Sequence, residues 1–575
     1  MLRFPKIPDA LFETGLLALA ALALIPVATN GFRSDDLVNA SISGNGDYFG
    51  YLRDDLRMWF VDRGRINALT IAFTDSVHWF LPRVFPYKIF LCALILSNVW
   101  LAGRFVRAVS GSVHWGFLAM LLAPLAFQLR LYHDPLLDFA GMLPFFVDLI
   151  LASLLLALRW DETGKKAFLV FSLAFYLASI LLYELAFPLL VLFPLLFFFR
   201  NRSLRHGVRA SLPFTLLAVS MALLTLLVRV ETPGGAGYYG ITPSWSPAVI
   251  LSTYAKQLVA GLPLSYVWGD PSFLFTYDPV FSGPVPWHEW LARAGFGAAL
   301  VALGARIFRD PPVEVGGLLA LFGLLMALLV ALLISFSSKY QSELHLGDGS
   351  WGLGYLPVYP QALGGVLVVL GALMAALRWL IPRGGLWAML AFGVLILAVI
   401  VPVYGATLAA NRKVSEQSNI DLHFRRQSLV LALEAGVLGD LPEGSRLLLL
   451  DEYTPRPYAP RLRSDLQGWS RSYRWRNSAF AKVHSGKTLR VCDTPEGARD
   501  LMKQASGGDG ASPLFRCTLY SHGLDSYRAG DPWARWGWIR VERLRGADPT
   551  APGELLVHWD AREALRTGKV GGKAK

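Results

Sequence analysis

The stretch "AFLVFSLAFYLASILLYELAFPLLVLFPLLFFF", residues 167–199, decides how many times this chain crosses a membrane. A helix of about 20 apolar residues spans the hydrocarbon core, and this stretch is too long for one crossing. Its middle, "LLYELAFP" at 181–188, carries Glu184 and Pro188, an acid and a helix breaker. We therefore predict two crossings, 167–182 and 185–200, joined by a turn at Glu184.

The rest of the first 406 residues is built in the same way. The chain is 54% hydrophobic and only 17% charged, with a mean hydropathy of +0.43. This composition is typical of an α-helical polytopic membrane protein. In all we predict about eleven transmembrane helices, near residues 10–29, 84–103, 113–130, 140–158, 167–182, 185–200, 210–230, 289–308, 316–336, 361–379 and 385–406.

The distribution of Lys and Arg predicts the orientation. If the N-terminus is cytoplasmic, six connections face the cytoplasm, and each carries at least two Lys or Arg. The short turn at 131–139 on the other face carries none. An odd number of crossings then places residues 30–83, 231–288, 338–360 and 407–575 outside the cytoplasm. We expect a bacterial inner (cytoplasmic) membrane protein.

The tail predicts a second domain. Residues 1–406 form the transmembrane domain, and residues 407–575 read as a soluble extracytoplasmic α/β domain. "SRLLLLDEY", "KTLRVCDT" and "GELLVHWD" indicate strands, "PEGARDLMKQ" indicates a helix, and "RTGKVGGKAK" indicates a disordered end. Cys492 and Cys517 could form a disulfide outside the cytoplasm or remain two free thiols.

The net charge of +12 would suggest nucleic acid in a soluble protein. Here membrane lipids explain it better, because Lys and Arg gather in cytoplasmic loops and beside anionic headgroups. No nucleic-acid-binding motif accompanies the charge, so we expect no nucleic-acid partner.

Two adjacent acids open the first outer loop. "GFRSDDL" at 31–37 places Asp35 and Asp36 directly after the first crossing, and Arg57, Arg63 and Arg65 follow. Residues 50–63 predict a short helix lying in the membrane interface. A carboxylate beside arginines suits sugar transfer from a lipid phosphate: the acid removes a proton from the acceptor hydroxyl or holds a divalent metal such as Mg²⁺ or Mn²⁺. The arginines would stabilise the departing phosphate. A solvated loop with weak surface ion pairs is the alternative.

This layout resembles the GT-C superfamily of polyprenyl-phosphate-sugar-dependent glycosyltransferases. The "DDL" at 35–37, followed by "MWFVDRGRIN" at 58–67, is similar to a bacterial subset related to serotype-converting glucosyltransferases. The resemblance covers residues 1–406 and implies a GT-C-like fold and a polyprenyl-phosphate-linked sugar donor. It also implies an envelope glycan or lipid acceptor, and a catalytic acid in the first loop. Asp35 is then the first choice for that acid and Asp36 the second.

Further candidates lie on the same predicted face. His133 and Asp134 in "LYHDPLLD" could bind substrate, or form a capping turn. Glu184 could bind substrate, or sit at a turn open to water. Lys339 and Tyr340 could hold the donor phosphate, or snorkel to an aromatic belt.

Two other functions share parts of this pattern. An envelope polymerase or ligase joins whole lipid-linked glycans and does not need the acidic pair. A secondary transporter also has many helices, but its substrate site lies near mid-membrane, where this chain has few ionisable residues. The chain has no phosphate-cradling loop, HExxH, paired CxxC or GxSxG motif, which argues against a nucleotide-driven pump or a zinc hydrolase.

Overall fold

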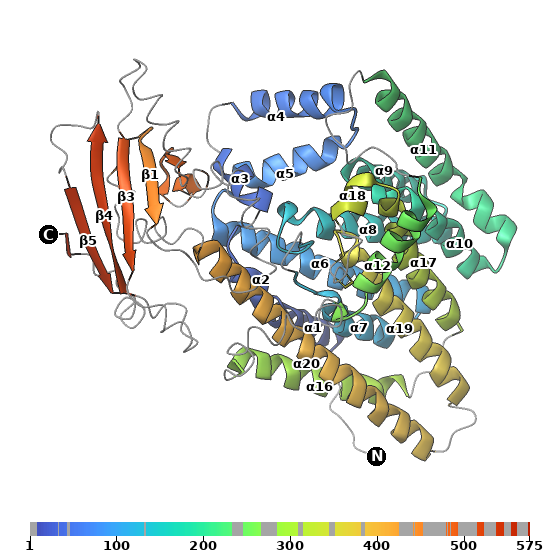
Figure 1. Cartoon of the computed structure of the whole chain (residues 1–575). Coiled ribbons are helices and arrows are strands. Elements are labelled where there is room, and N and C mark those ends of the chain that lie inside the picture. Colours follow the sequence, from blue (N-terminus) through green and yellow to red (C-terminus); the bar gives the residue numbers. More distant parts are fainter. Residues whose placement is uncertain are drawn as a thin grey trace.

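A computed structural model shows a large bundle of helices and a small β-sheet (Figure 1). It describes residues 8–424 except 33, 43–46, 131–133, 233–244, 266–284, 309–313, 344–350, 353 and 381–385. Beyond residue 424 it describes short stretches, at 441, 443–451, 479, 481–483, 485–492, 514–521, 536–545, 554–560 and 573–574. The helix predicted at "PEGARDLMKQ" in the tail lies outside the described residues, and so does His133.

The first half of the bundle consists of α1 Asp9–Ala23, α2 Ile25–Ala28, α3 Ser34–Ile42, α4 Tyr48–Arg57, α5 Ala68–Phe80, α6 Val84–Ser110, α7 Val113–Leu122, α8 Met142–Thr163, α9 Lys166–Leu182 and α10 Leu192–Asn201. The second half consists of α11 Leu204–Glu231, α12 Pro247–Ala260, α16 Trp287–Ile307, α17 Gly316–Ser335, α18 Ser338–Glu343, α19 Val358–Leu380 and α20 Leu386–Phe424. Short 3₁₀ and π turns extend several of these helices: Met58–Asp62, Ala123–Ala126, Phe139–Gly141, Glu184–Ala186 and Pro188–Val191.

Eight helical segments in the described part of the chain are long and apolar enough to cross a membrane. The other three predicted runs form shorter helices. The run at 10–29 breaks after Ala23, just before Pro26, and the run at 113–130 leaves the α-helix at Ala123, just before Pro124. Proline removes a backbone donor and clashes with the preceding turn, which accounts for both interruptions. The predicted division of 167–200 is observed, because α9 ends at Leu182 and a new helical segment starts at Glu184.

Glycines allow α17 and α19 to cross at close range. A Cβ on Gly323 would lie 2.4 Å from the carbonyl oxygen of Gly364, and a Cβ on Gly364 would lie 2.6 Å from that of Gly323. A second such contact joins Gly316 and Gly371, about two turns away on each helix. Small residues let the backbones of membrane helices approach and pack, which lipid alone would not drive.

The last helix of the bundle is longer than the sequence predicts. α20 continues to Phe424, past residue 406, where the apolar run ends. Its later turns are tied to other helices by polar side chains: Ser415 donates to the carbonyl of Pro26 at 2.8 Å, and Arg412 pairs with Glu289 at 2.6 Å. Arg412 and Ser415 in this extension therefore make packing contacts.

The first predicted loop is itself mostly helical. α4 and α5 lie side by side at the top of the view in Figure 1, with α3 next to α5. Tyr51 stacks on Trp79 at 5.9 Å, which holds α4 against α5. α4 and the turn after it form the helix expected over 50–63, with Phe49 and Phe60 largely exposed.

The C-terminal strands are β1 Arg446–Asp451, β2 Arg490–Cys492, β3 Leu514–Ser521, β4 Trp536–Arg545, β5 Glu554–Asp560 and β6 Lys573–Ala574. They form one sheet in the order β2-β1-β3-β4-β5-β6, parallel from β2 to β3 and antiparallel after it. The strands at "RLLLLD", "RVC" and "ELLVHWD" were predicted. Lys573–Ala574 pairs with β5, so the expectation of a wholly disordered end is wrong at these two residues.

Cys492 lies on β2 and Cys517 on β3, and β1 lies between these strands. The side chains of both cysteines lie outside the described part of the chain, so the disulfide and the two free thiols both remain predictions.

Candidate functional site

Asp36 is the buried centre of the site. It lies on α3 and none of its surface is exposed. The backbone N–H of Ala140 donates to Asp36 Oδ1 at 3.0 Å, and the Tyr87 hydroxyl donates to Asp36 Oδ2. Segments far apart in the sequence, α3, α6 and the turn before α8, thus meet at one carboxyl group. Asp35 precedes it on α3, but its side chain lies outside the described part of the chain.

The turn that supplies the Ala140 N–H has an unusual backbone. Phe139 and Ala140 have φ of 64° and 55°, and Gly141 follows with φ of 77°. Left-handed conformations are costly for residues other than glycine, and two in succession persist only where surrounding contacts impose them. Here the contact is the hydrogen bond from the Ala140 N–H to Asp36.

Two charged side chains adjoin Asp36. Lys88 is 1% exposed and lies over the Tyr87 ring, with Nζ 5.1 Å from the ring centroid. Asp138 is also 1% exposed. The pKa of Asp36 is raised to about 7: burial and, after it, the charge of Asp138 raise it, while the Tyr87 hydrogen bond, Lys88 and the Ala140 N–H lower it. Near neutral pH, Asp36 can therefore both accept and release a proton.

His78 closes the site from α5. Its Nδ1 is 2.9 Å from the carbonyl oxygen of Thr74, and its Nε2 is 3.5 Å from Asp36 Oδ1. Its ring stacks on Tyr87 at 5.5 Å. Burial lowers the pKa of His78 to about 4, so the ring is neutral at pH 7. We refer to Asp36, His78, Tyr87, Lys88 and Asp138 as the Asp36 cluster.

Asp134 supports this cluster from outside. It is fully buried, and its Oδ1 accepts the backbone N–H groups of Leu136 and Leu137 at 2.7 and 2.8 Å. Its own N–H donates to Asp138 Oδ2 at 3.0 Å. Asp134 therefore forms a capping turn, the alternative to substrate binding, and its backbone N–H holds Asp138. His133 is not among the described residues.

The predicted arginines lie away from Asp36. Arg63 and Arg65 pack over the Trp59 ring, at 4.5 and 5.7 Å from its centroid, and Arg57 is exposed on α4. The charge of Arg63 interacts electrostatically with Asp55, and the charge of Arg65 interacts electrostatically with Tyr183. The charged groups with the largest effect on Asp36 are instead Asp138 and Lys88.

A second polar group forms where α9 ends. Tyr183, Tyr340 and Tyr355 gather near Arg65, and the Tyr340 and Tyr355 rings are 4.5 Å apart. Lys339 lies over the Tyr340 ring at 5.6 Å. We call Arg65, Tyr183, Tyr340 and Tyr355 the tyrosine cluster. Arg65 precedes α5 and His78 lies near the end of α5, so about 15 Å of helix separates this cluster from the Asp36 cluster.

Glu184 is occupied by an ion pair. Its carboxylate accepts from Arg229 on α11 at 2.6 Å, and about a quarter of each side chain is exposed. The pair ties the turn after α9 to the end of α11. Glu184 therefore has a structural partner that the sequence analysis does not identify.

A divalent metal does not fit the described site. Across the described residues no three His, Cys, Asp or Glu side chains are grouped so that they could hold a metal ion. Both Asp36 oxygens already accept hydrogen bonds, and the Lys88 ammonium supplies the neighbouring positive charge. Mg²⁺ and Mn²⁺ need several free oxygen ligands. We derive no step through a metal.

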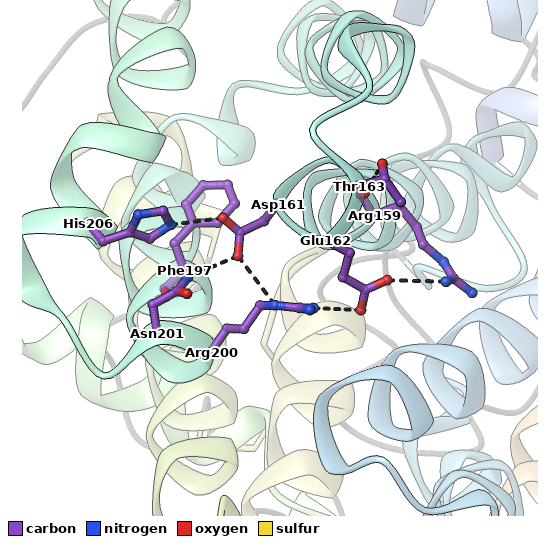
Figure 2. A network of polar contacts seen from close by, with 8 residues as sticks. All are labelled: Arg159, Asp161, Glu162, Thr163, Phe197, Arg200, Asn201 and His206. Atoms are coloured by element: carbon purple, nitrogen blue, oxygen red, sulfur yellow. Dashed lines mark hydrogen bonds and ion pairs between the residues drawn. The ribbon is translucent and has the colours of Figure 1, made fainter.

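At the opposite end of the bundle a third polar group joins α8, α10 and α11 (Figure 2). His206 contacts Asp161 at 2.8 Å, and Arg200 contacts Glu162 at 2.6 Å. Arg159 and Asn201 complete what we call the Asp161 network. α8 has 22 residues, and at 1.5 Å per residue it separates the network from the Asp36 cluster by about 33 Å.

No protein-family model matches this chain, and no curated protein is significantly similar to it in sequence. Solved structures similar to it include ArnT from Cupriavidus metallidurans bound to undecaprenyl phosphate. The two chains are 12% identical, 90% of this chain and 94% of that chain are covered, and the TM-score is 0.37. The apo state of the same protein is 14% identical over 90% and 93% of the two chains, with a TM-score of 0.36.

Proposed function

We propose that this chain is a membrane glycosyltransferase of the GT-C type, which moves one sugar from a polyprenyl-phosphate donor to an envelope glycan or lipid. The observation that carries the proposal is the fully buried Asp36, whose pKa is raised to about 7, next to the buried Lys88. Buried ionisable groups at membrane helices are costly and mark functional sites. The resemblance of "DDL" and "MWFVDRGRIN" to that superfamily supports the same assignment.

Asp36 is the base in this mechanism. As the acceptor hydroxyl attacks the anomeric carbon, a new C–O bond forms, the bond from that carbon to the phosphate oxygen breaks, and the hydroxyl proton passes to Asp36. The polyprenyl phosphate leaves with the bonding electron pair. A base whose pKa lies near the working pH is most effective for such a transfer.

Lys88 stabilises the departing phosphate. It is the positive side chain that acts most strongly on Asp36, and its charge is buried where electrostatic interactions are strong. In this proposal it takes the role that the sequence analysis gives to Arg57, Arg63, Arg65 and Lys339. The tyrosine cluster, about 15 Å away along α5, is assigned to polar groups of the acceptor.

Substrate must uncover Asp36 before it can react. No surface of Asp36 is exposed, and the rings of Phe32, Tyr87 and His78 pack on one another at centroid distances of 4.9–6.2 Å. We therefore expect the described state to be a closed, substrate-free state, and binding to shift it to an open one. The outer leaflet is the expected side, because the predicted orientation places residues 30–83, which include Asp36, outside the cytoplasm.

The test is a donor panel. Purified protein in liposomes is incubated with polyprenyl-phosphate sugars and an envelope lipid extract, and release of the lipid phosphate is followed. The proposal predicts that one donor is consumed and one sugar is added to the acceptor. Absence of consumption with every donor would contradict it.

The same assay separates the alternatives. A polymerase or ligase would yield long products from lipid-linked glycans instead of single-sugar additions. A transporter would take up labelled solute into the liposomes without releasing lipid phosphate. A reporter fused after Lys575 tests the predicted outside location of the tail.

A further inference from the structure

His78 has an orientation that the proposed reaction does not by itself require. A backbone carbonyl oxygen can only accept a hydrogen bond, so the contact between His78 Nδ1 and Thr74 O places the proton on Nδ1. In a neutral imidazole Nε2 then carries a lone pair and no proton. This bare nitrogen is buried and makes no hydrogen bond within the described structure.

The bare nitrogen faces an oxygen of Asp36. His78 Nε2 and Asp36 Oδ1 are 3.5 Å apart. When Asp36 is ionised, two acceptors confront each other without a proton between them, which is unfavourable in a buried site. When Asp36 is protonated on Oδ1, the new O–H points to a ready acceptor. The geometry is thus complete in the protonated state of Asp36.

We infer that His78 is a positioning residue that holds the proton removed by Asp36, in a hydrogen bond from Asp36 Oδ1–H to His78 Nε2. The catalytic role of this hydrogen bond rests on the proposed function, whereas the hydrogen bond itself does not. In chemical terms, the acceptor O–H bond breaks and an O–H bond forms on Asp36. The electron pair of the acceptor oxygen goes into the new glycosidic bond, and His78 donates and loses nothing.

Other ionisable groups face this pair from each packed element. Tyr87 and Lys88 belong to α6, and Asp138 belongs to the turn before α8. On α5 itself, Asp75 lies one turn before His78 and pairs with Asp55 of α4. Beside these groups, His78 supplies the unprotonated nitrogen that faces Asp36 Oδ1.

The decisive variant is His78→Gln. The glutamine amide can donate to the Asp36 carboxylate and so stabilises its ionised form, which is the opposite of what histidine does. We expect the acid limb of the rate profile to move down by about one pH unit and the plateau rate to fall about tenfold, because the base becomes weaker. The acceptor KM should not change. His206→Gln, which alters the His–Asp contact of the Asp161 network, is the matched control and should leave the profile in place.

Infrared titration gives a second readout that needs no activity. The carboxylic-acid C=O band that Asp36→Asn removes reports protonation of Asp36 in the resting protein. His78→Gln should shift the titration of that band to lower pH. If no donor is consumed but the band shifts, the proposed function fails and the proton-holding pair stands. If folded His78→Gln shows an unshifted band and an unshifted rate profile, the inference is wrong.

Discussion

Two Asp–His contacts occur at opposite ends of this bundle, and they differ in almost every physical respect. Asp161 and His206 are 2.8 Å apart, with 7% and 41% of their side chains exposed. Asp36 and His78 are 3.5 Å apart, with 0% and 1% exposed. The shorter contact is the more solvated one, so distance alone does not show which pair is functional.

The charges around each pair explain the contrast. In the Asp161 network, Arg159, Arg200 and His206 surround two acids, and every acid has a basic partner (Figure 2). The Asp36 cluster buries two acids with one lysine. A balanced, partly exposed network costs little and joins helices. An unbalanced buried one is expensive, and a protein keeps it where the chemistry needs a shifted pKa.

Apart from replacement of Asp36 itself, the largest expected effect is that of Lys88→Met. Removing the buried ammonium leaves the departing phosphate and Asp36 without their nearest positive charge, so transfer should fall by about 10²–10³-fold. Initial rates of lipid-phosphate release measure this. Arg200→Met removes a cation from the Asp161 network and should leave the rate unchanged. If folded Lys88→Met transfers sugar at the normal rate, Lys88 has no place in the mechanism.

A smaller effect is expected from Asp138→Asn. The charge of Asp138 raises the pKa of Asp36, so its removal should lower that pKa and move the acid limb of the rate profile to lower pH. The plateau rate should fall by about tenfold or less, since Asp36 becomes a weaker base. The amide can still accept from the Asp134 N–H. An acid limb that stays in place, or moves to higher pH, would contradict the assigned electrostatics.

Asp75 extends the comparison to stability. It is 7% exposed and pairs with Asp55, and burial together with Asp55 raises its pKa to about 7. Its folded pKa lies above the ordinary value, so its stabilising contribution is complete below about pH 4 and is lost as the pH rises through 7. Asp75→Asn should therefore raise the thermal inactivation midpoint at pH 8 by about 2–4 °C and have little effect at pH 5. An equal shift at both pH values would exclude this titration.

The smallest effect belongs to His206→Gln. Partly exposed ion pairs contribute at most about 1 kcal/mol to stability. We expect a slightly lower inactivation midpoint in detergent and an unchanged transfer rate. A large loss of activity would mean that the Asp161 network takes part in the reaction, which would contradict a purely structural role for it.

The long helices could be predicted because each carries its signal locally. Apolar runs near residues 84–103, 210–230 and 316–336 became α6, α11 and α17, and "LLYELAFP" broke the helix where expected. Run length was less reliable where proline interrupted it, as at Pro26 and Pro124. Hydropathy measures composition, whereas helix length also depends on backbone hydrogen bonds that proline removes.

The site was only partly predictable. The pair Asp35 and Asp36 could be picked out because acids rarely follow a membrane helix directly, but the resemblance ranks Asp35 first, and the side chain of Asp35 lies outside the described part of the chain. Lys88 had a signal that the analysis missed, a lone charge inside the apolar run at 84–103. Asp138 ends the stretch "LYHDPLLD", in which His133 and Asp134 were the predicted site residues. His78 had no signal, because 42 positions separate it from Asp36 and only the fold brings the two together. The turn at Ala140 could not be predicted either, because neither Phe139 nor Ala140 is a residue type that favours a left-handed backbone.

The most direct test is the single-turnover transfer rate of Asp36→Asn, measured beside Asp161→Asn with the same donor, acceptor and amount of folded protein. Asparagine keeps the size of Asp36 and removes its ability to take a proton. We expect a loss of about 10³-fold or more for Asp36→Asn, and a rate within about twofold of the wild type for Asp161→Asn. Transfer by folded Asp36→Asn at a rate near that of the wild type would contradict the claim that this buried acid performs the chemistry.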